Sequence, residues 1–226
     1  MSRFQHAPTE PASEKCKNAY YILRYAHDTA SGLLDTFEQV RTARKAKGAP
    51  TDEEQDLLRA MLAFASAGLD SMVKQLIRDS LWLVIRRNEG AHAQFKTFVE
   101  RRIKRKDGMD HGFLAGVLTS ATPRQVLASQ LIAELTGESL QARETLLKAI
   151  SHFDIPSSEI TSDLGLLDRI FRARNEIVHE MDIDFTHVNR NRRSRRRDDM
   201  LTYADELFRI SDAVLSRVDI RCAPKK

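Results

Sequence analysis

The chain contains few residues that interrupt secondary structure, with only 9 Gly and 6 Pro among 226 residues. Together with 42% hydrophobic and 30% charged residues, this scarcity argues against a disordered or low-complexity chain and for a folded protein. The length suits one domain, or one domain with an appendage.

Cysteine and long apolar runs are scarce as well. Cys16 and Cys222 lie near opposite ends of the chain and lack the spacing of a metal site, so we expect two thiols in a reducing compartment. The first residues contain no apolar segment long enough for a secretory signal. The longest run of aliphatic or aromatic residues, 81–85, is far shorter than a membrane span. We therefore expect a cytoplasmic protein without membrane association.

Acidic and basic residues nearly balance except in one segment. The formal net charge is +4, yet residues 186–197 (THVNRNRRSRRR) contain six Arg and no acid, against 30 basic and 32 acidic residues elsewhere. Such tracts commonly bind polyphosphate. We define the Arg tract by its members: Arg190, Arg192, Arg193, Arg195, Arg196 and Arg197.

Apolar residues recur at helical spacing over nearly the whole chain. Thr51 and Glu54 form a capping-box pattern at the start of a long helix, and Thr122-Pro123 is a typical helix start. The periodicity predicts helices over residues 14–46, 52–85, 92–105, 123–137, 139–153, 164–181 and 198–218.

These helices predict an all-α bundle, because amphipathic helices must bury their apolar faces against one another. No strand, hairpin or internal repeat is recognisable. We expect a lead and helix over residues 1–48 and a helical bundle over residues 49–226, together as one compact domain.

An R-N-E-x-x-H string occurs twice: RNEGAH at residues 87–92, the first segment, and RNEIVH at residues 174–179, the second segment. With 25 Arg and 7 His, chance alone gives about one Arg-x4-His pair in such a chain. The spacing by itself is therefore weak evidence, and at least one copy is expected to be incidental.

Both segments also contain Glu-x-x-His, the pair that helices contribute to the di-iron site of ferritin-like bundles. Such a site needs its ligands to face the bundle interior. On a helical wheel of about 100° per residue, Glu176 points away from the apolar face and towards solvent. The first segment has polar flanks and a helix-weakening Gly90. We therefore expect no metal and no other cofactor, and the di-iron carboxylate bundle is a third alternative.

The same wheel places Arg174 at the centre of an apolar stripe. The stripe consists of Leu167, Ile170, Phe171, Ile177, Val178 and Met181. A buried, unpaired guanidinium costs several kcal/mol, so a carboxylate, a partner subunit or an anionic substrate must neutralise Arg174. Asn175 and His179 share one edge of the stripe, within reach of the long Arg174 side chain. A structural salt bridge and an anion site are both compatible with this pattern.

The second segment, on a late helix of an all-α chain, resembles the signature of the HEPN superfamily, an Arg often followed by Asn or Asp and then, after a few residues, by His. Residues 57–81 (LLRAMLAFASAGLDSMVKQLIRDSL) are similar to the opening bundle helix of the RiboL-PSP subgroup, which carries an acid in a Leu- and Ala-rich run. The resemblance covers roughly residues 52–218. His179 is followed by Glu180-Met181, so the Tyr of the toxin branch paired with nucleotidyltransferases is absent.

The resemblance implies a metal-independent endoribonuclease acting as a homodimer, with the motifs of two protomers facing one cleft. RNA supplies its own nucleophile, the 2′-hydroxyl. His179 would take or return a proton, Arg174 would hold the scissile phosphate, and Asn175 would orient the phosphate or His179. Products would carry a 2′,3′-cyclic phosphate and a 5′-hydroxyl. The family also implies a toxin or anti-phage defence role, with an antitoxin or other defence protein as partner.

Two further features have both a functional and a structural interpretation. Asp70 matches the acid of the family's first bundle helix and would orient Arg174, or it is a solvated helix position. The Arg tract would contact RNA phosphates without sequence preference, or it is a disordered linker. A non-catalytic helical module that binds nucleic acid or a protein through the Arg tract is therefore the alternative to a ribonuclease.

Overall fold

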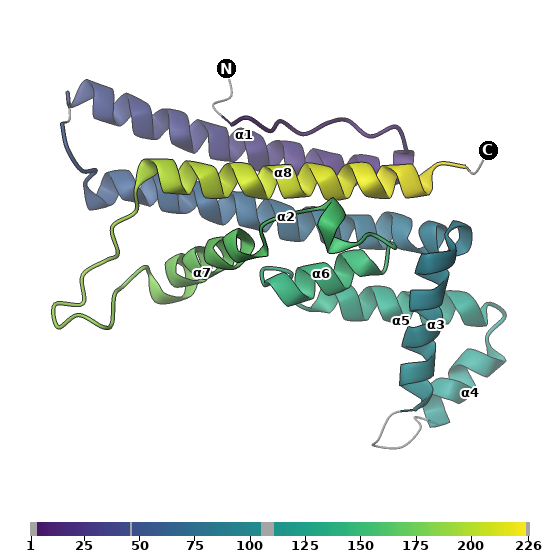
Figure 1. Ribbon diagram of the computed structural model, residues 1–226. Helices are drawn as coiled ribbons and strands as arrows, with labels where there is room; N and C mark the ends of the chain where they lie inside the picture. The colour runs from purple at the N-terminus through teal and green to yellow at the C-terminus, as the bar shows by residue number, and fades with distance from the viewer. Residues whose placement is uncertain (1–3, 46, 105–110, 225–226) are drawn as a thin grey trace.

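The structure, a computed structural model, describes residues 4–45, 47–104 and 111–224, and α-helices dominate these ranges (Figure 1). The elements are α1 (Glu14–Ala43), α2 (Asp52–Arg87), α3 (Glu89–Ile103), α4 (His111–Thr119), α5 (Pro123–Gly137), α6 (Arg143–Ser151), the 3₁₀ helix η1 (Ser157–Glu159), α7 (Leu164–Glu180) and α8 (Arg197–Cys222). Within the described ranges, β-type pairing is limited to an isolated bridge between Ile183 and Arg192. The predicted all-α fold is confirmed.

Three long helices, α1, α2 and α8, form the body of the molecule, and α5, α6 and α7 lie on the other side of α2 (Figure 1). The reason lies in α2, whose buried residues are distributed around most of its circumference, so that helices cover it on several sides. α1 and α8 contribute to the same continuous core as α2. No helix in the described ranges has the length and apolar content required to span a bilayer.

The junction of α2 and α3 differs from the prediction. α2 ends at Arg87, and Asn88 caps α3 by accepting the Ala91 N–H at 2.8 Å. α3 therefore begins at Glu89 and not at residue 92, and Gly90 lies in its first turn. A larger residue would not fit at this position, because a Cβ at Gly90 would lie 2.1 Å from the Asp154 carboxylate. α4 is an additional helix, absent from the sequence prediction.

An extended lead, residues 4–13, runs along α8 (Figure 1). Asp205, Asp212 and Asp219 of α8 accept its backbone N–H groups; those of Thr9 and Ser13, for example, donate to Asp212 and Asp219 at 2.7 Å each. Seven helical residues rise about 10 Å, close to the span of three extended residues. The seven-residue spacing of the aspartates therefore matches the spacing of the N–H groups along the extended lead.

The two cysteines meet where α1 begins and α8 ends. Cys16 and Cys222 are both buried free thiols. The hydrogen bond between them, together with burial, raises the pKa of Cys16, and the same hydrogen bond lowers the pKa of Cys222. Residues far apart in the sequence thus close one end of the bundle together.

Candidate functional site

The second segment lies at the C-terminal end of α7. Met181 ends this helix in a left-handed conformation (φ 53°), and the Asp182 N–H then donates to the Glu176 carbonyl at 2.8 Å. The Met181 N–H donates to the same carbonyl, and a left-handed residue at a helix end is most often Gly. Asp182 is left-handed as well (φ 62°), so two consecutive non-Gly residues hold a costly conformation directly after the segment.

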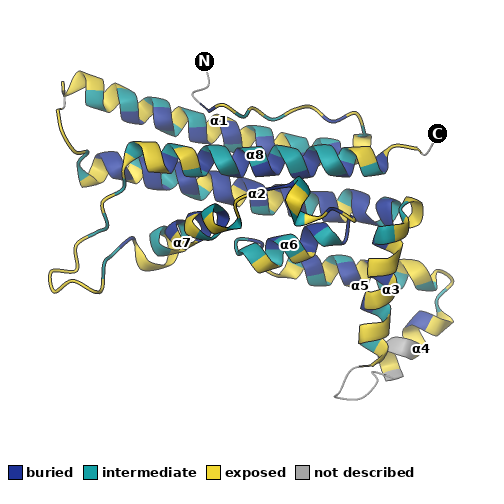
Figure 2. Cartoon of the chain, viewed as in Figure 1, coloured by how far each residue is buried: buried dark blue, intermediate teal, exposed yellow. Residues whose placement is uncertain are grey.

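Only the N-terminal half of the apolar stripe on α7 is buried (Figure 2). Leu167 and Ile170 lie in the core, whereas Val178 and Met181 are 41% and 63% exposed. The prediction that Val178 and Met181 belong to the buried face is therefore wrong for the single chain. The part of the stripe that carries Arg174 extends beyond the core and is open to a ligand or to another chain.

Arg174, Asn175 and His179 converge at this open end. The Arg174 Nη1 atom lies 3.0 Å from Asn175 Oδ1 and 3.2 Å from His179 Nε2. A guanidinium only donates hydrogen bonds, so Nε2 is the accepting ring nitrogen and neutral His179 carries its proton on Nδ1. Asn175 and His179 are exposed, while the buried Arg174 Nε has no hydrogen-bond partner among the described residues. The predicted catalytic residues are thus in mutual contact.

Arg174 is not part of a salt bridge within the described ranges, because no carboxylate there lies within ion-pair distance. Burial lowers the pKa of Arg174, and the more distant negative charge of Asp70 opposes this effect. Asp70 itself accepts the Leu140 N–H at 2.7 Å and pairs with Lys74 at 2.9 Å. The structure therefore places Asp70 near enough to stabilise the charge of Arg174, but not in contact with it.

A buried ion-pair cluster anchors the chain just after the second segment. Asp182 is fully buried and accepts hydrogen bonds from Arg59 Nε of α2 at 2.8 Å and from Arg195 Nε at 3.0 Å. Arg195 Nη2 also donates to Glu176 at 2.7 Å. Glu176 is 22% exposed, so the prediction that it points to solvent is wrong: it faces the Arg tract.

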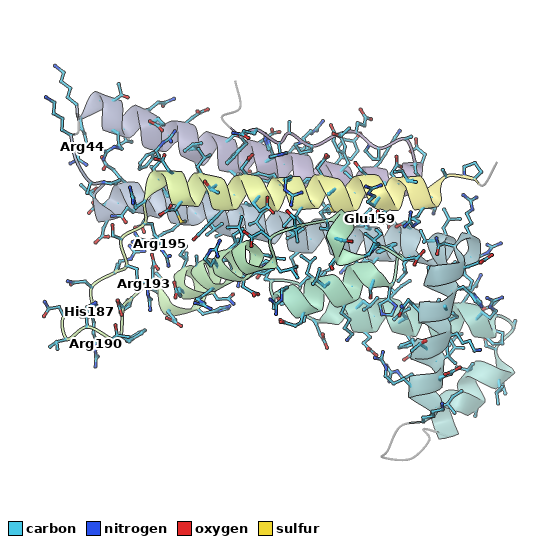
Figure 3. The ribbon with its side chains drawn as sticks, viewed as in Figure 1. Arg44, Glu159, His187, Arg190, Arg193 and Arg195 are labelled. Carbon is cyan, nitrogen blue, oxygen red and sulfur yellow. The ribbon has the colours of Figure 1, made fainter. Side chains whose placement is uncertain are left out.

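Acids of the same chain pair with most of the Arg tract. Arg192 pairs with Asp56 at 2.7 Å, and Arg193, Arg195 and Arg197 pair with acids as well. Arg190 and Arg196 are exposed and form no ion pair within the ranges that the structure describes. Arg190 lies at the tip of the loop between α7 and α8 (Figure 3). The tract is therefore mainly a structural element, with two side chains left for an external anion.

The first segment is built differently. Arg87 ends α2 and donates from Nη1 to the Cys222 carbonyl at 2.5 Å, and Asn88 is a helix cap. His92 Nδ1 lies 3.4 Å from Nη2 of Arg124, on α5. Arg, Asn and His contact one another in the second segment. In the first segment they contact the Cys222 carbonyl, the Ala91 N–H and Arg124, respectively.

A pocket opens beside Asn175, between α6 and α7. Arg143, Arg172 and Asn175 are among the residues that line it. Arg143 pairs with Asp168, whereas exposed Arg172 forms no ion pair with any described residue. Four carboxylates, of Glu144, Asp168, Glu176 and Glu180, also line the pocket, so Arg172 is a local unpaired charge at its edge and the lining as a whole is not positive.

No group of three or more potential metal ligands (His, Cys, Asp or Glu) clusters within the described part of the chain. No protein-family model, no curated protein and no solved structure matches this chain. Its function must therefore be argued from the geometry of the site.

Arg59 and Asp182, which support the site, were not predicted from the sequence. The signal that identified Arg174 also applies to Arg59, because Arg59 interrupts the apolar run LLRAML and is only 3% exposed. Asp182 carried no local signal, since its partners Arg59 and Arg195 lie on α2 and in the loop that precedes α8.

Proposed function

We propose that this chain is a metal-independent endoribonuclease of the HEPN type. The observation that carries the proposal is that one guanidinium contacts both partners of the motif: Arg174 Nη1 lies 3.0 Å from Asn175 Oδ1 and 3.2 Å from His179 Nε2. No described carboxylate pairs with Arg174. A cation without an acid, beside a titratable imidazole, suits acid–base attack on a phosphodiester.

The chemistry follows from the atoms at the site. When a phosphate of RNA draws the Arg174 donors towards itself, His179 Nε2 loses its hydrogen bond and is free to take the proton of the 2′-hydroxyl. The 2′-oxygen then bonds to phosphorus while the bond to the 5′-oxygen breaks. The leaving oxygen takes a proton from a protonated imidazole, of His179 or of its copy in a partner protomer. The products are a 2′,3′-cyclic phosphate and a 5′-hydroxyl, and Arg174 stabilises the charge that develops on the phosphate.

The surroundings of the second segment suit a second copy of the chain. Val178 and Met181, with Phe185 and Val188 on the following loop, are 41%, 63%, 59% and 99% exposed. Large apolar side chains left exposed along one stretch of the chain favour burial in an interface. A homodimer through this face would bring two copies of the segment into one cleft, as the HEPN resemblance implies.

RNA would be held by the side chains that acids of this chain leave unpaired. Arg172 lines the pocket beside Asn175, and Arg190 and Arg196 are the exposed members of the Arg tract. Contacts of this kind hold the phosphate backbone without sequence preference. The setting we propose, a toxin or anti-phage system with an antitoxin or other defence protein, rests on the resemblance alone.

The test is cleavage of a panel of single-stranded RNAs in EDTA by wild type, Arg174→Ala and His179→Ala. We expect wild type to cleave and each variant to lose about 100-fold or more in rate, because each removes a charge-stabilising or proton-transferring group. If wild type cleaves none of the RNAs, or if both variants cleave normally, the proposal is wrong and a non-catalytic binding module becomes the better account.

Arg169→Ala is the matched control. Arg169 is an exposed arginine of the same helix, and it only approaches Asp163 at the surface, at 3.9 Å. We expect this variant to keep the wild-type rate, which would separate the loss of Arg174 from a general loss of positive charge on α7.

A further inference from the structure

A basic pocket lies at the corner where α2 turns into α3, around the first segment. Its lining includes Arg86, Arg87, Asn88, Glu89, His92 and Arg124. Its volume of about 480 Å³ falls within the range of sites for small ligands. None of these residues belongs to the second segment or to the Arg tract.

The pocket differs from the Arg tract in how its charge is balanced. Neither Arg86 nor Arg124 forms an ion pair with any residue that the structure describes, and both are exposed. Arg87 donates to the Cys222 carbonyl, which does not neutralise it. Glu89 is the only carboxylate in the lining, so the positive charges outnumber the negative ones.

Two helix N-termini add to this positive potential. His92 lies in the first turn of α3 and Arg124 in the first turn of α5, and each helix is 15 residues long. Thr122, at the start of α5, makes no side-chain cap hydrogen bond; Pro123 has no N–H and the Gln125 N–H donates to the Thr122 carbonyl at 3.0 Å, so the Arg124 N–H is the donor that a cap would have satisfied. Asp154 lies against Gly90 behind the first turn of α3 and offsets part of the charge at that helix only.

The hydrogen-bond donors of the pocket also suit an oxyanion. Arg124 Nη2 lies 3.4 Å from His92 Nδ1, so Nδ1 accepts and the neutral ring presents its N–H at Nε2. The guanidinium groups of α2 and α5, together with this N–H, supply donors from three helices. Guanidinium groups match the geometry of phosphate oxygens, to which they donate in pairs.

We propose that this pocket is a binding site for a phosphate group. The phosphate belongs either to a small phosphorylated molecule or to an RNA backbone, and the chemistry of recognition is the same. Arg87 lies 17 residues beyond Asp70 on α2, which corresponds to about 25 Å along the helix. The phosphate site is therefore separate from the second segment, and it stands whether or not the chain cleaves RNA.

The test is calorimetric titration of the whole chain in low-chloride buffer at constant ionic strength. The probes are inorganic phosphate, adenosine 5′-monophosphate and a short RNA protected by 2′-O-methyl groups. We expect wild type to bind inorganic phosphate and the double variant Arg86→Ala/Arg124→Ala to bind it about tenfold or more weakly, since two charged donors are lost. Tighter binding of the nucleotide than of the RNA would identify a small molecule as the natural ligand, and the reverse would identify RNA.

Arg78→Ala is the control for general electrostatics. Arg78 is exposed on α2, two turns before the pocket, and its loss should leave phosphate affinity within about twofold of wild type. Circular dichroism would show that each variant keeps the helical fold. The proposal is overturned if wild type binds none of the probes, if the double variant binds phosphate as wild type does, or if Arg78→Ala weakens binding as much as the double variant.

Discussion

The two Arg-Asn-Glu-x-x-His segments share a string of letters and almost nothing else. In the first segment the helix breaks inside the string: Arg87 belongs to α2, while Asn88 caps α3. In the second segment the helix is continuous, so Arg174 and His179 lie about one and a half turns apart and share a hydrogen bond at 3.2 Å. The same residues thus form a helix junction in one place and a converging polar site in the other.

The continuity of the helix, more than the motif, therefore determines which of the two segments can act as one unit. Asn88 uses its side chain to satisfy the Ala91 N–H, and Gly90 lets Asp154 approach. In α7 the corresponding residue, Asn175, does not cap a helix, and its side chain contacts Arg174.

The largest expected effect is on the ion-pair cluster that holds the chain after the second segment. Asp182→Ala leaves buried Arg59 without its fully buried partner and places Ala in a left-handed conformation. We expect the free energy of unfolding to fall by about 3–5 kcal/mol, measured by urea denaturation. Hydrogen exchange should accelerate at the end of α7 and remain unchanged at the start of α3.

Asp56→Ala provides the comparison for this effect. Asp56 also pairs with Arg59, at 2.9 Å, but it is 51% exposed, so its loss should cost about 1 kcal/mol or less. Equal effects of the two substitutions would show that burial of Asp182 is not what stabilises the second segment.

The next effect depends on pH and concerns the side of the molecule that carries α3 and α6. His152 is buried, and its Nδ1 has no hydrogen-bond partner in the part of the chain that the structure describes. Burial, followed by the charges of Arg101 and Lys148, lowers the pKa of His152 to about 4. An unfolded His titrates near pH 6.5, so between pH 6.5 and pH 4 the unfolded chain binds a proton that the folded chain does not. Stability is therefore lost as the pH falls, by about 3 kcal/mol at pH 4 from this group.

His152→Leu should remove this part of the pH dependence, which urea denaturation at pH 7 and pH 4.5 would show. Exposed His187 provides the control, because His187→Ala should keep the wild-type loss of stability. A His152→Leu protein as acid-sensitive as wild type would mean that His152 is accessible to protons in the folded state.

The smallest effect compares the two asparagines directly. Asn88→Ala removes a helix cap and should cost about 1 kcal/mol. Asn175→Ala lies inside a helix and should change stability by about 0.5 kcal/mol or less, while it slows RNA cleavage. Thermal denaturation of both variants measures the contrast, and a larger loss of stability at Asn175 would indicate a structural role for its contact with Arg174.

The sequence predicted the helices well because periodicity and capping are local. Thr51 and Glu54, for example, form the expected capping box. It also predicted that Arg174 can reach Asn175 and His179, since neighbours on one helix turn are fixed by helical geometry.

The pairing of the Arg tract was not predictable, because it depends on acids far away in the chain. Glu38 and Asp56, which pair with Arg197 and Arg192, lie in α1 and α2. The exposure of Val178 and Met181 was missed for a related reason: periodicity identifies an apolar face, but only packing shows where along the helix the core ends.

The central claim is that the second segment cleaves RNA with the 2′-hydroxyl as nucleophile. The most direct measurement compares an oligoribonucleotide that wild type cleaves in EDTA with the same oligonucleotide carrying a 2′-O-methyl group at the cleaved position, with the ends of the products identified by mass spectrometry. The account predicts 2′,3′-cyclic phosphate and 5′-hydroxyl ends, and no cleavage at the methylated position. Cleavage there, or products with a 3′-hydroxyl and a 5′-phosphate, would contradict it, because water and not the 2′-hydroxyl would then be the nucleophile.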